Sequence, residues 1–97
     1  MLAEYDSEAD ALSIDLIEAA VWEESVSIDD TYCQVALSGG LPVNIELLSP
    51  AGSLHLLDQV ADRFGIARDE VQAAARSALA APDRQVTLRF SPHVSTL

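Results

Sequence analysis

The sequence predicts an α+β fold, an antiparallel β-meander of about five or six strands with two helices packed on one face. In the first half of the chain, apolar and polar residues alternate as they do in half-buried antiparallel strands. After residue 53, apolar residues recur three or four positions apart, which is typical of amphipathic helices. We therefore expect a single domain over residues 1–97, with a β-meander at 1–51, a helix–helix–strand extension at 53–90 and a tail at 91–97.

The first three predicted strands follow from the period of two. Residues 2–17 read as a β-hairpin, because the alternating run after residue 11 can pair with the segment before the acidic turn. Residues 21–28 alternate again, and their inner face is expected to hold Trp22, Val26 and Ile28. The acids at 29 and 30 suggest a turn, and the next strand begins directly after it.

A glycine pair separates that strand from the next. Gly39 and Gly40 can adopt the positive φ angles that tight hairpin turns require. Residues 42–48 then alternate sharply, with their odd-numbered apolar side chains on one face. Pro42 falls at the start of this strand, where a missing N–H group is best tolerated.

The helical part has clear boundaries. A first helix is expected from residue 54, with Ser53 as its N-cap and Gly65 as its stop. A second helix is expected from about Arg68 to Ala80. A last strand follows, whose apolar residues are predicted to point inward: Val86, Leu88 and Phe90.

Charge is distributed very unevenly. The net charge is −11, and residues 1–62 contain thirteen acidic residues and no lysine or arginine. Such a field repels nucleic acid and favours cationic partners, although a role in solubility or adaptation to a salty cytoplasm explains it equally well. One cysteine, no apolar membrane-spanning stretch and no signal-peptide pattern predict a cytoplasmic protein that does not insert into membranes.

The acids of the first turn invite a metal hypothesis. Asp6, Glu8 and Asp10 have the spacing of the first three ligands of a calcium loop. Such a loop also needs glycine at its sixth position and glutamate at its twelfth, where this chain has Ala11 and Ile17. We therefore expect no metal, no cofactor and no catalytic residues, and instead a turn in which Asp6 accepts backbone hydrogen bonds.

Two other features leave alternatives open. Glu46 lies in the middle of a predicted strand, where it is either solvated or, beneath a partner, a buried hydrogen-bonding or ion-pairing group. Residues 54–80 have the shape of a helix-turn-helix, with a polar stripe of Arg68, Gln72 and Arg76. The acidic charge favours a helical hairpin packed on a sheet over a DNA-reading element.

Two motifs resemble those of a bacterial family of uncharacterised small proteins, the domain of unknown function 2283. The stretch at residues 4–16 resembles its first motif through Tyr5, Asp6, Glu8, Ala9, Asp10, Ala11 and Leu12. The second motif is matched by Ile45, Glu46, Leu48 and, less closely, Ala51, while Asn44 stands where the family has glycine. The resemblance covers residues 3–51 and implies a small β-meander without assigned activity. It also implies an acidic, antitoxin-like partner of a small basic protein.

These observations predict a non-enzymatic acidic interaction protein. We expect a homodimer or a basic protein partner, and no nucleic acid or membrane partner. A small DNA-binding regulator that uses residues 54–80 is the alternative function. The residues expected at an interface or in structural roles are Tyr5, Asp6, Asp10, Ile17, Val21, Glu46 and Leu48.

Overall fold

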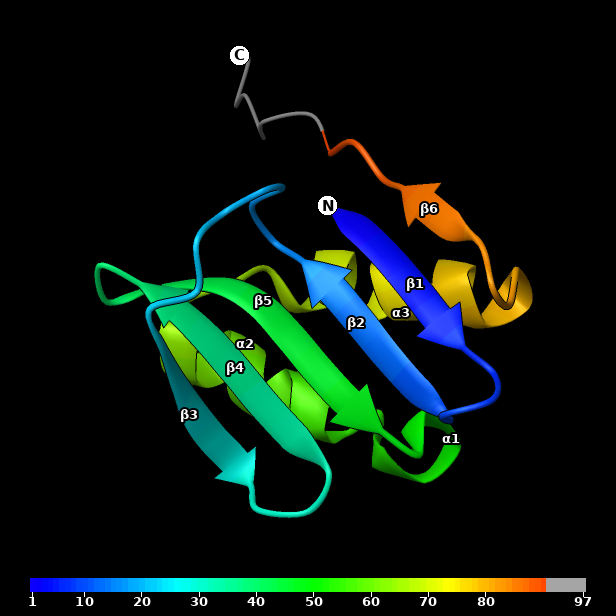
Figure 1. Cartoon of the computed structure of the whole chain (residues 1–97), viewed down its shortest axis with the longest axis horizontal. Coiled ribbons are helices and arrows are strands. Elements are labelled where there is room, and N and C mark those ends of the chain that lie inside the picture. The colour runs from blue at the N-terminus through cyan, green and yellow to red at the C-terminus, as the bar shows by residue number, and fades with distance from the viewer. Residues whose placement is uncertain (91–97) are drawn as a thin grey trace, which may run out of the picture.

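A computed structural model describes residues 1–90 and confirms the α+β class. Six antiparallel strands form one sheet in the order β3-β4-β5-β2-β1-β6, and the helices lie on one side of it (Figure 1). The strands are β1 (Leu2–Asp6), β2 (Ala11–Asp15), β3 (Glu24–Asp29), β4 (Cys33–Ser38), β5 (Leu41–Leu48) and β6 (Gln85–Thr87). The helices are α1 (Pro50–Ser53), α2 (Leu56–Phe64) and α3 (Arg68–Ala80).

The two acidic turns form as the sequence predicts. Asp6 Oδ1 accepts hydrogen bonds from the N–H groups of Glu8 and Ala9, at 3.0 and 3.2 Å, and so fixes the β1–β2 turn. Asp29 Oδ1 does the same in the β3–β4 turn, where it accepts from the N–H groups of Thr31 and Tyr32. In both turns a carboxylate satisfies backbone donors that the strands cannot pair.

The β4–β5 hairpin depends on glycine. Gly39 and Gly40 have φ angles of 57° and 80°, and Ser38 pairs directly with Leu41 across this two-residue loop. Two successive positive φ angles match the twist of the flanking strands, and they are costly for residues with a side chain. The predicted turn at the glycine pair is therefore confirmed.

The two N-terminal strands insert beside β5. β2 pairs with β5, so the connection over residues 16–23 must cross β5 and β4 to reach β3 at the edge. Figure 1 shows this connection in front of the strands, on the side away from the helices. Ala36 and Asn44 point to that side and are nevertheless only 5% and 1% exposed. One end of the open sheet face is thus covered.

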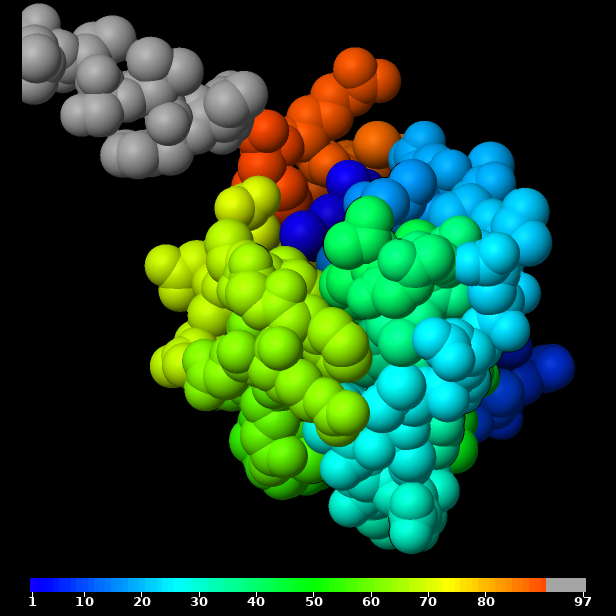
Figure 2. All heavy atoms as spheres, turned by 90° about the vertical axis from the view of Figure 1, so that its left-hand side faces the viewer, coloured from blue at the N-terminus to red at the C-terminus, as the bar shows by residue number. Residues whose placement is uncertain are grey.

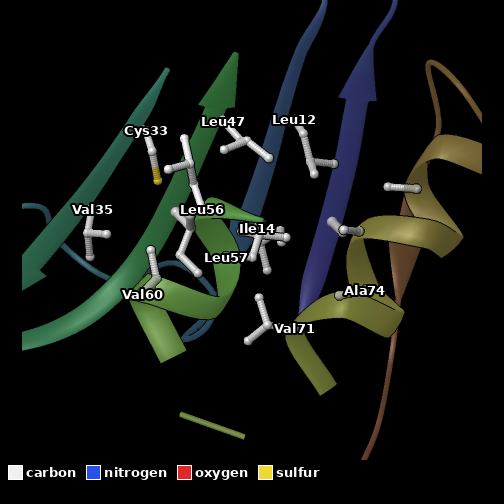
Figure 3. Packing of buried hydrophobic residues seen from close by; sticks show 14 of the residues in the cluster. Leu12, Ile14, Cys33, Val35, Leu47, Leu56, Leu57, Val60, Val71 and Ala74 are labelled. Atoms are coloured by element: carbon white, nitrogen blue, oxygen red, sulfur yellow. The ribbon is translucent and has the colours of Figure 1, made fainter. Parts of the chain in front are cut away.

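The core lies between the sheet and the helices α2 and α3 (Figure 3). α2 ends at Gly65, whose φ of 67° and backbone bond to the Ala61 carbonyl form the predicted stop. Three alanines on α3, Ala74, Ala75 and Ala78, are completely buried, and their small side chains allow the helix backbone to approach the sheet closely. The central buried residues include Leu12, Ile14, Val35, Ile45, Leu47, Leu57, Val60, Val71, Ala74, Ala75 and Ala78.

Three local predictions were wrong. Trp22 is 56% exposed, because the strand begins only at Glu24 and the tryptophan belongs to the crossing connection. Ser53 caps no helix: its hydroxyl is buried and donates to the carbonyls of Leu48 and Ser49. Phe90 is exposed, because the last strand ends at Thr87. The predicted tail at 91–97 lies outside the described residues.

Candidate functional site: an acidic sheet face

The face of the sheet turned away from the helices carries the candidate site. Strand register places Glu4 opposite Ser13, Ser13 opposite Glu46, and Glu46 opposite Gln34 in one row across four strands. Asp15 lies two residues after Ser13 on the same face of β2, and Asp6 lies two residues after Glu4 on the same face of β1. We call the surface carrying these carboxylates the acidic face, defined by Glu4, Asp6, Asp15 and Glu46.

A shallow hollow of about 260 Å³ lies on the acidic face. It contains no basic side chain, and its lining consists of Leu2, Glu4, Asp6, Ala11, Leu12, Ser13, Asp15, Glu46 and Gln85. Because neighbouring strands lie about 4.8 Å apart, Glu4 and Glu46 are separated by roughly 10 Å across Ser13. That spacing suits two contacts with one extended cationic surface and is too wide for a shared proton.

The charge of the acidic face is not neutralised from within the described part of the chain. Asp6 Oδ1 is engaged by backbone N–H groups, and Asp15 Oδ1 accepts a hydrogen bond from Asn44 Nδ2 at 2.7 Å. Neither of these donors carries a positive charge. Across residues 1–90 the only basic side chain that forms salt bridges is Arg68, whose partners Asp58 and Asp62 are on α2. A ligand that binds the acidic face must therefore supply the positive charge.

The structure separates the predicted site residues into three groups. Tyr5, Asp6 and Asp10 meet at the first hairpin, where the Tyr5 hydroxyl donates to Asp10 Oδ1 at 2.6 Å. Glu46 is exposed on the acidic face, and Leu48 is 39% exposed at the end of the same strand. Exposed apolar side chains of the crossing connection form the third group, and these are Ile17 and Val21.

Sequence reasoning did not include Glu4 and Asp15 of the acidic face among the site residues, nor Ser13, which lies between Glu4 and Glu46. The signal was present, because the inward positions of Leu12 and Ile14 place the residues between and after them on the other face. The alternation of apolar and polar residues could not predict that these residues lie close to Glu46, because that proximity depends on β2 pairing with β5.

Cys33 is unsuited to nucleophilic chemistry at neutral pH. Its side chain is 1% exposed, in the core between β4 and the helices. Burial, with a smaller effect of the negative charge of Asp29, raises the pKa of the thiol to about 11. Since the thiolate is the reactive form, this cysteine serves packing.

Part of the polar stripe of α3, predicted to consist of Arg68, Gln72 and Arg76, contacts the preceding helix α2. Arg68 Nη2 lies 2.7 Å from Asp62 Oδ1, and Arg68 Nε lies 3.7 Å from Asp58 Oδ1. Gln72 Nε2 donates to the Leu54 carbonyl and to Asp58 Oδ1, at 3.0 and 3.2 Å. Two of the three side chains that could face phosphates thus bind acids or backbone of the preceding turn and helix.

Three further results concern the chain as a whole. None of the helices in the described range is long and apolar enough to cross a membrane. The resemblance to the domain of unknown function 2283 stays a prediction from residues 3–51. In comparisons with known proteins, no family model, no curated protein and no solved structure matches the chain.

Proposed function

We propose that the protein is a non-enzymatic binding module that holds a cationic protein against its acidic face. The observation that carries this proposal is the row Glu4–Ser13–Glu46, which places unneutralised carboxylates on a sheet surface that no helix of residues 1–90 covers. A sheet presents such groups on a rigid backbone, so little ordering free energy is spent when a partner binds.

The position of the arginines supports the same partner class. All five arginines follow residue 62, and none lines the hollow of the acidic face. The negative field over the first two thirds of the chain would steer a basic protein toward this surface and accelerate association at low salt. It would repel a phosphate backbone from the same surface.

Titration calorimetry with an arginine oligomer tests the proposal. The double variant Glu4→Gln/Glu46→Gln removes two charges from the acidic face, and we expect it to weaken binding about tenfold, which corresponds to about 1.4 kcal/mol. The matched control Glu8→Gln/Glu18→Gln removes two exposed charges outside that row and brings the net charge to the same value, −11 + 2 = −9.

The control variant should bind nearly as tightly as the wild type. Equal weakening in both variants would mean that only net charge matters and would contradict a defined binding face. Absence of saturable binding at low salt would reject the proposed function altogether.

A further inference from the structure

We infer that the free edge of β3 receives an extended segment of the cationic partner as a seventh strand, an inference that rests on the proposed function. Among the described residues, β3 pairs only with β4 and ends the sheet on that side. Alternate residues of an antiparallel edge strand direct their N–H and C=O groups away from the sheet, where they can pair with an incoming strand. Figure 2 faces this edge and shows β3 uncovered by other described elements.

A hollow beneath the edge gives the added strand room for side chains. It has a volume of about 440 Å³ and lies between β3 and α2, where Ile28, Gln59, Asp62 and Arg63 line it. Ile28 and Val26 are only half-buried although they point to the helix side. A seventh strand would place every second side chain over this hollow. Because Ile28 lines the hollow and the charges of Asp62 and Arg63 oppose each other there, those side chains should be neutral and apolar.

Charge selects the occupant of the edge. β3 has acids at both ends: it begins with Glu24, directly after Glu23, and it ends with Asp29, directly before Asp30. In an antiparallel pair of two copies, the acids at the start of one β3 would meet those at the end of the other, and like charges directly opposite are destabilising. A cationic strand replaces this repulsion with attraction. The occupant is therefore a segment with alternating apolar and basic residues.

The opposite edge of the sheet is a poorer template. β6 has only three paired residues, and its two ends are fastened to the N-terminal hairpin. Asp83 accepts hydrogen bonds from the N–H group and hydroxyl of Ser7, at 2.9 and 2.6 Å. Met1 and Leu88 exchange two backbone bonds at 2.8 Å at the other end. β3 is twice as long and carries neither proline nor lysine, the residues that commonly protect edges.

The test uses the full chain and a short capped peptide of alternating arginine and valine. Residue-resolved hydrogen exchange should show that this peptide slows exchange at the outward amides of β3 by at least about tenfold, which corresponds to about 1.4 kcal/mol. A second peptide has the same number of arginines but a central proline, which cannot complete the ladder. It should leave the exchange at β3 unchanged.

Two protein variants separate edge pairing from general attraction. Glu24→Gln removes the charge at the first residue of β3. It should weaken binding of the alternating peptide and reduce the protection of the β3 amides. Glu8→Gln removes one exposed charge from the β1–β2 turn, outside both β3 and the acidic face, and should leave the protection at β3 unchanged. Both substitutions lower the negative charge by one, so a difference between them reports position.

Each other outcome overturns the inference in a distinguishable way. One such outcome is that both peptides bind equally without protecting β3, and that the Glu4→Gln/Glu46→Gln variant binds them more weakly. In that case the partner binds the acidic face alone, and the proposed function stands. If neither peptide binds, the proposed function fails as well. If β3 becomes protected with rising protein concentration and no peptide, a second copy occupies the edge.

Discussion

The hydroxyl of Tyr5 donates a hydrogen bond to Asp10 Oδ1 at 2.6 Å across the first hairpin turn. The two residues are the aromatic and the last acid of the motif that resembles the domain of unknown function 2283. Their contact gives that motif a structural meaning: tyrosine at the end of β1 and aspartate before β2 fasten the two strands where the turn begins and ends. Asp10 has a φ of 51°, a conformation that aspartate and asparagine tolerate better than most residues.

Replacement of the acid should change how Tyr5 ionises. The hydrogen bond to Asp10 raises the pKa of the Tyr5 hydroxyl above its usual value, followed by desolvation and by the charges of neighbouring acids. Asp10→Asn should lower this pKa in an ultraviolet titration, and a Tyr32→Phe background isolates the signal of Tyr5. The Tyr5–Asp10 hydrogen bond stabilises the fold below the pKa of tyrosine in the unfolded chain, about 10. This contribution is lost as pH rises through the higher pKa of Tyr5 in the folded protein. An unchanged titration would mean that the bond does not persist in solution.

The contact between Asp83 and Ser7 should make stability depend on pH. Hydrogen bonds from the Ser7 hydroxyl and N–H group lower the pKa of the Asp83 carboxyl. Its contribution to stability is therefore present above the unfolded pKa, about 4, and is lost as pH falls through the lower folded pKa. In urea unfolding, Asp83→Asn should be less stable than the wild type at neutral pH and equal to it in strong acid. Glu8→Gln, in the same region, is the control and should show no such pH-dependent difference.

Neighbouring leucines of β5 provide a matched test of the core. Leu47 is fully buried and Leu48 is 39% exposed. Leu47→Ala should lower the free energy of unfolding by about 2–5 kcal/mol, because it removes buried contacts and leaves a cavity. Leu48→Ala should cost well under half as much, since most surface substitutions stay within about 0.5 kcal/mol. If urea denaturation gave similar losses of unfolding free energy for the two variants, Leu48 would have to be covered in solution.

Asn44 should be sensitive to a change of charge. Its side chain is 1% exposed, and Nδ2 donates to Ser13 Oγ and Asp15 Oδ1, at 2.9 and 2.7 Å. Asn44→Asp replaces this donor with a second carboxylate and should cost about 1–3 kcal/mol at neutral pH. Acid should restore part of the loss, because a protonated carboxyl can donate again. Ser25→Asp adds the same charge to the exposed edge strand, and a comparable penalty there would contradict the role of the buried bond.

Self-association is expected through the connection between β2 and β3. Ile17, Val21 and Trp22 are 51%, 73% and 56% exposed, so three large apolar side chains lie close together in the chain and in contact with water. Light scattering at micromolar concentration should give about twice the chain mass of 10.4 kDa. Val21→Glu should shift the protein toward monomer, whereas Leu41→Gln should have a smaller effect. A clean monomer in low and high salt would contradict this prediction.

Local physics made much of the fold predictable. The period of two identified the inward residues of β2 and β5, the glycine pair identified a hairpin, and Gly65 identified the end of α2. Each of these signals is decided within a few residues by backbone conformation or by the alternation of faces. The turn role of Asp6 was predictable for the same reason.

The rest depended on contacts between distant segments. The neighbour of β2 is β5 because residues 16–23 cross the sheet, and no local pattern encodes that path. The crossing also explains why Trp22 is exposed, although the alternation assigned it to the inner face, and why Asn44 is buried on the side away from the helices. The acidic face could be anticipated one strand at a time, but not as a surface that joins Glu4 to Glu46.

The pairing of β1 with β6 has a consequence for synthesis on the ribosome. Leu2 pairs with Thr87, so β1 receives its second neighbour from a segment that is synthesised much later. Until residue 88 has left the exit tunnel, β1 is an open edge on a growing polypeptide, and open edges recruit other strands. Because like charges placed opposite each other are destabilising, the acidic residues Glu4 and Asp6 would disfavour pairing between nascent copies during this interval. The same charges that we assign to partner binding would thus protect the unfinished chain from its neighbours.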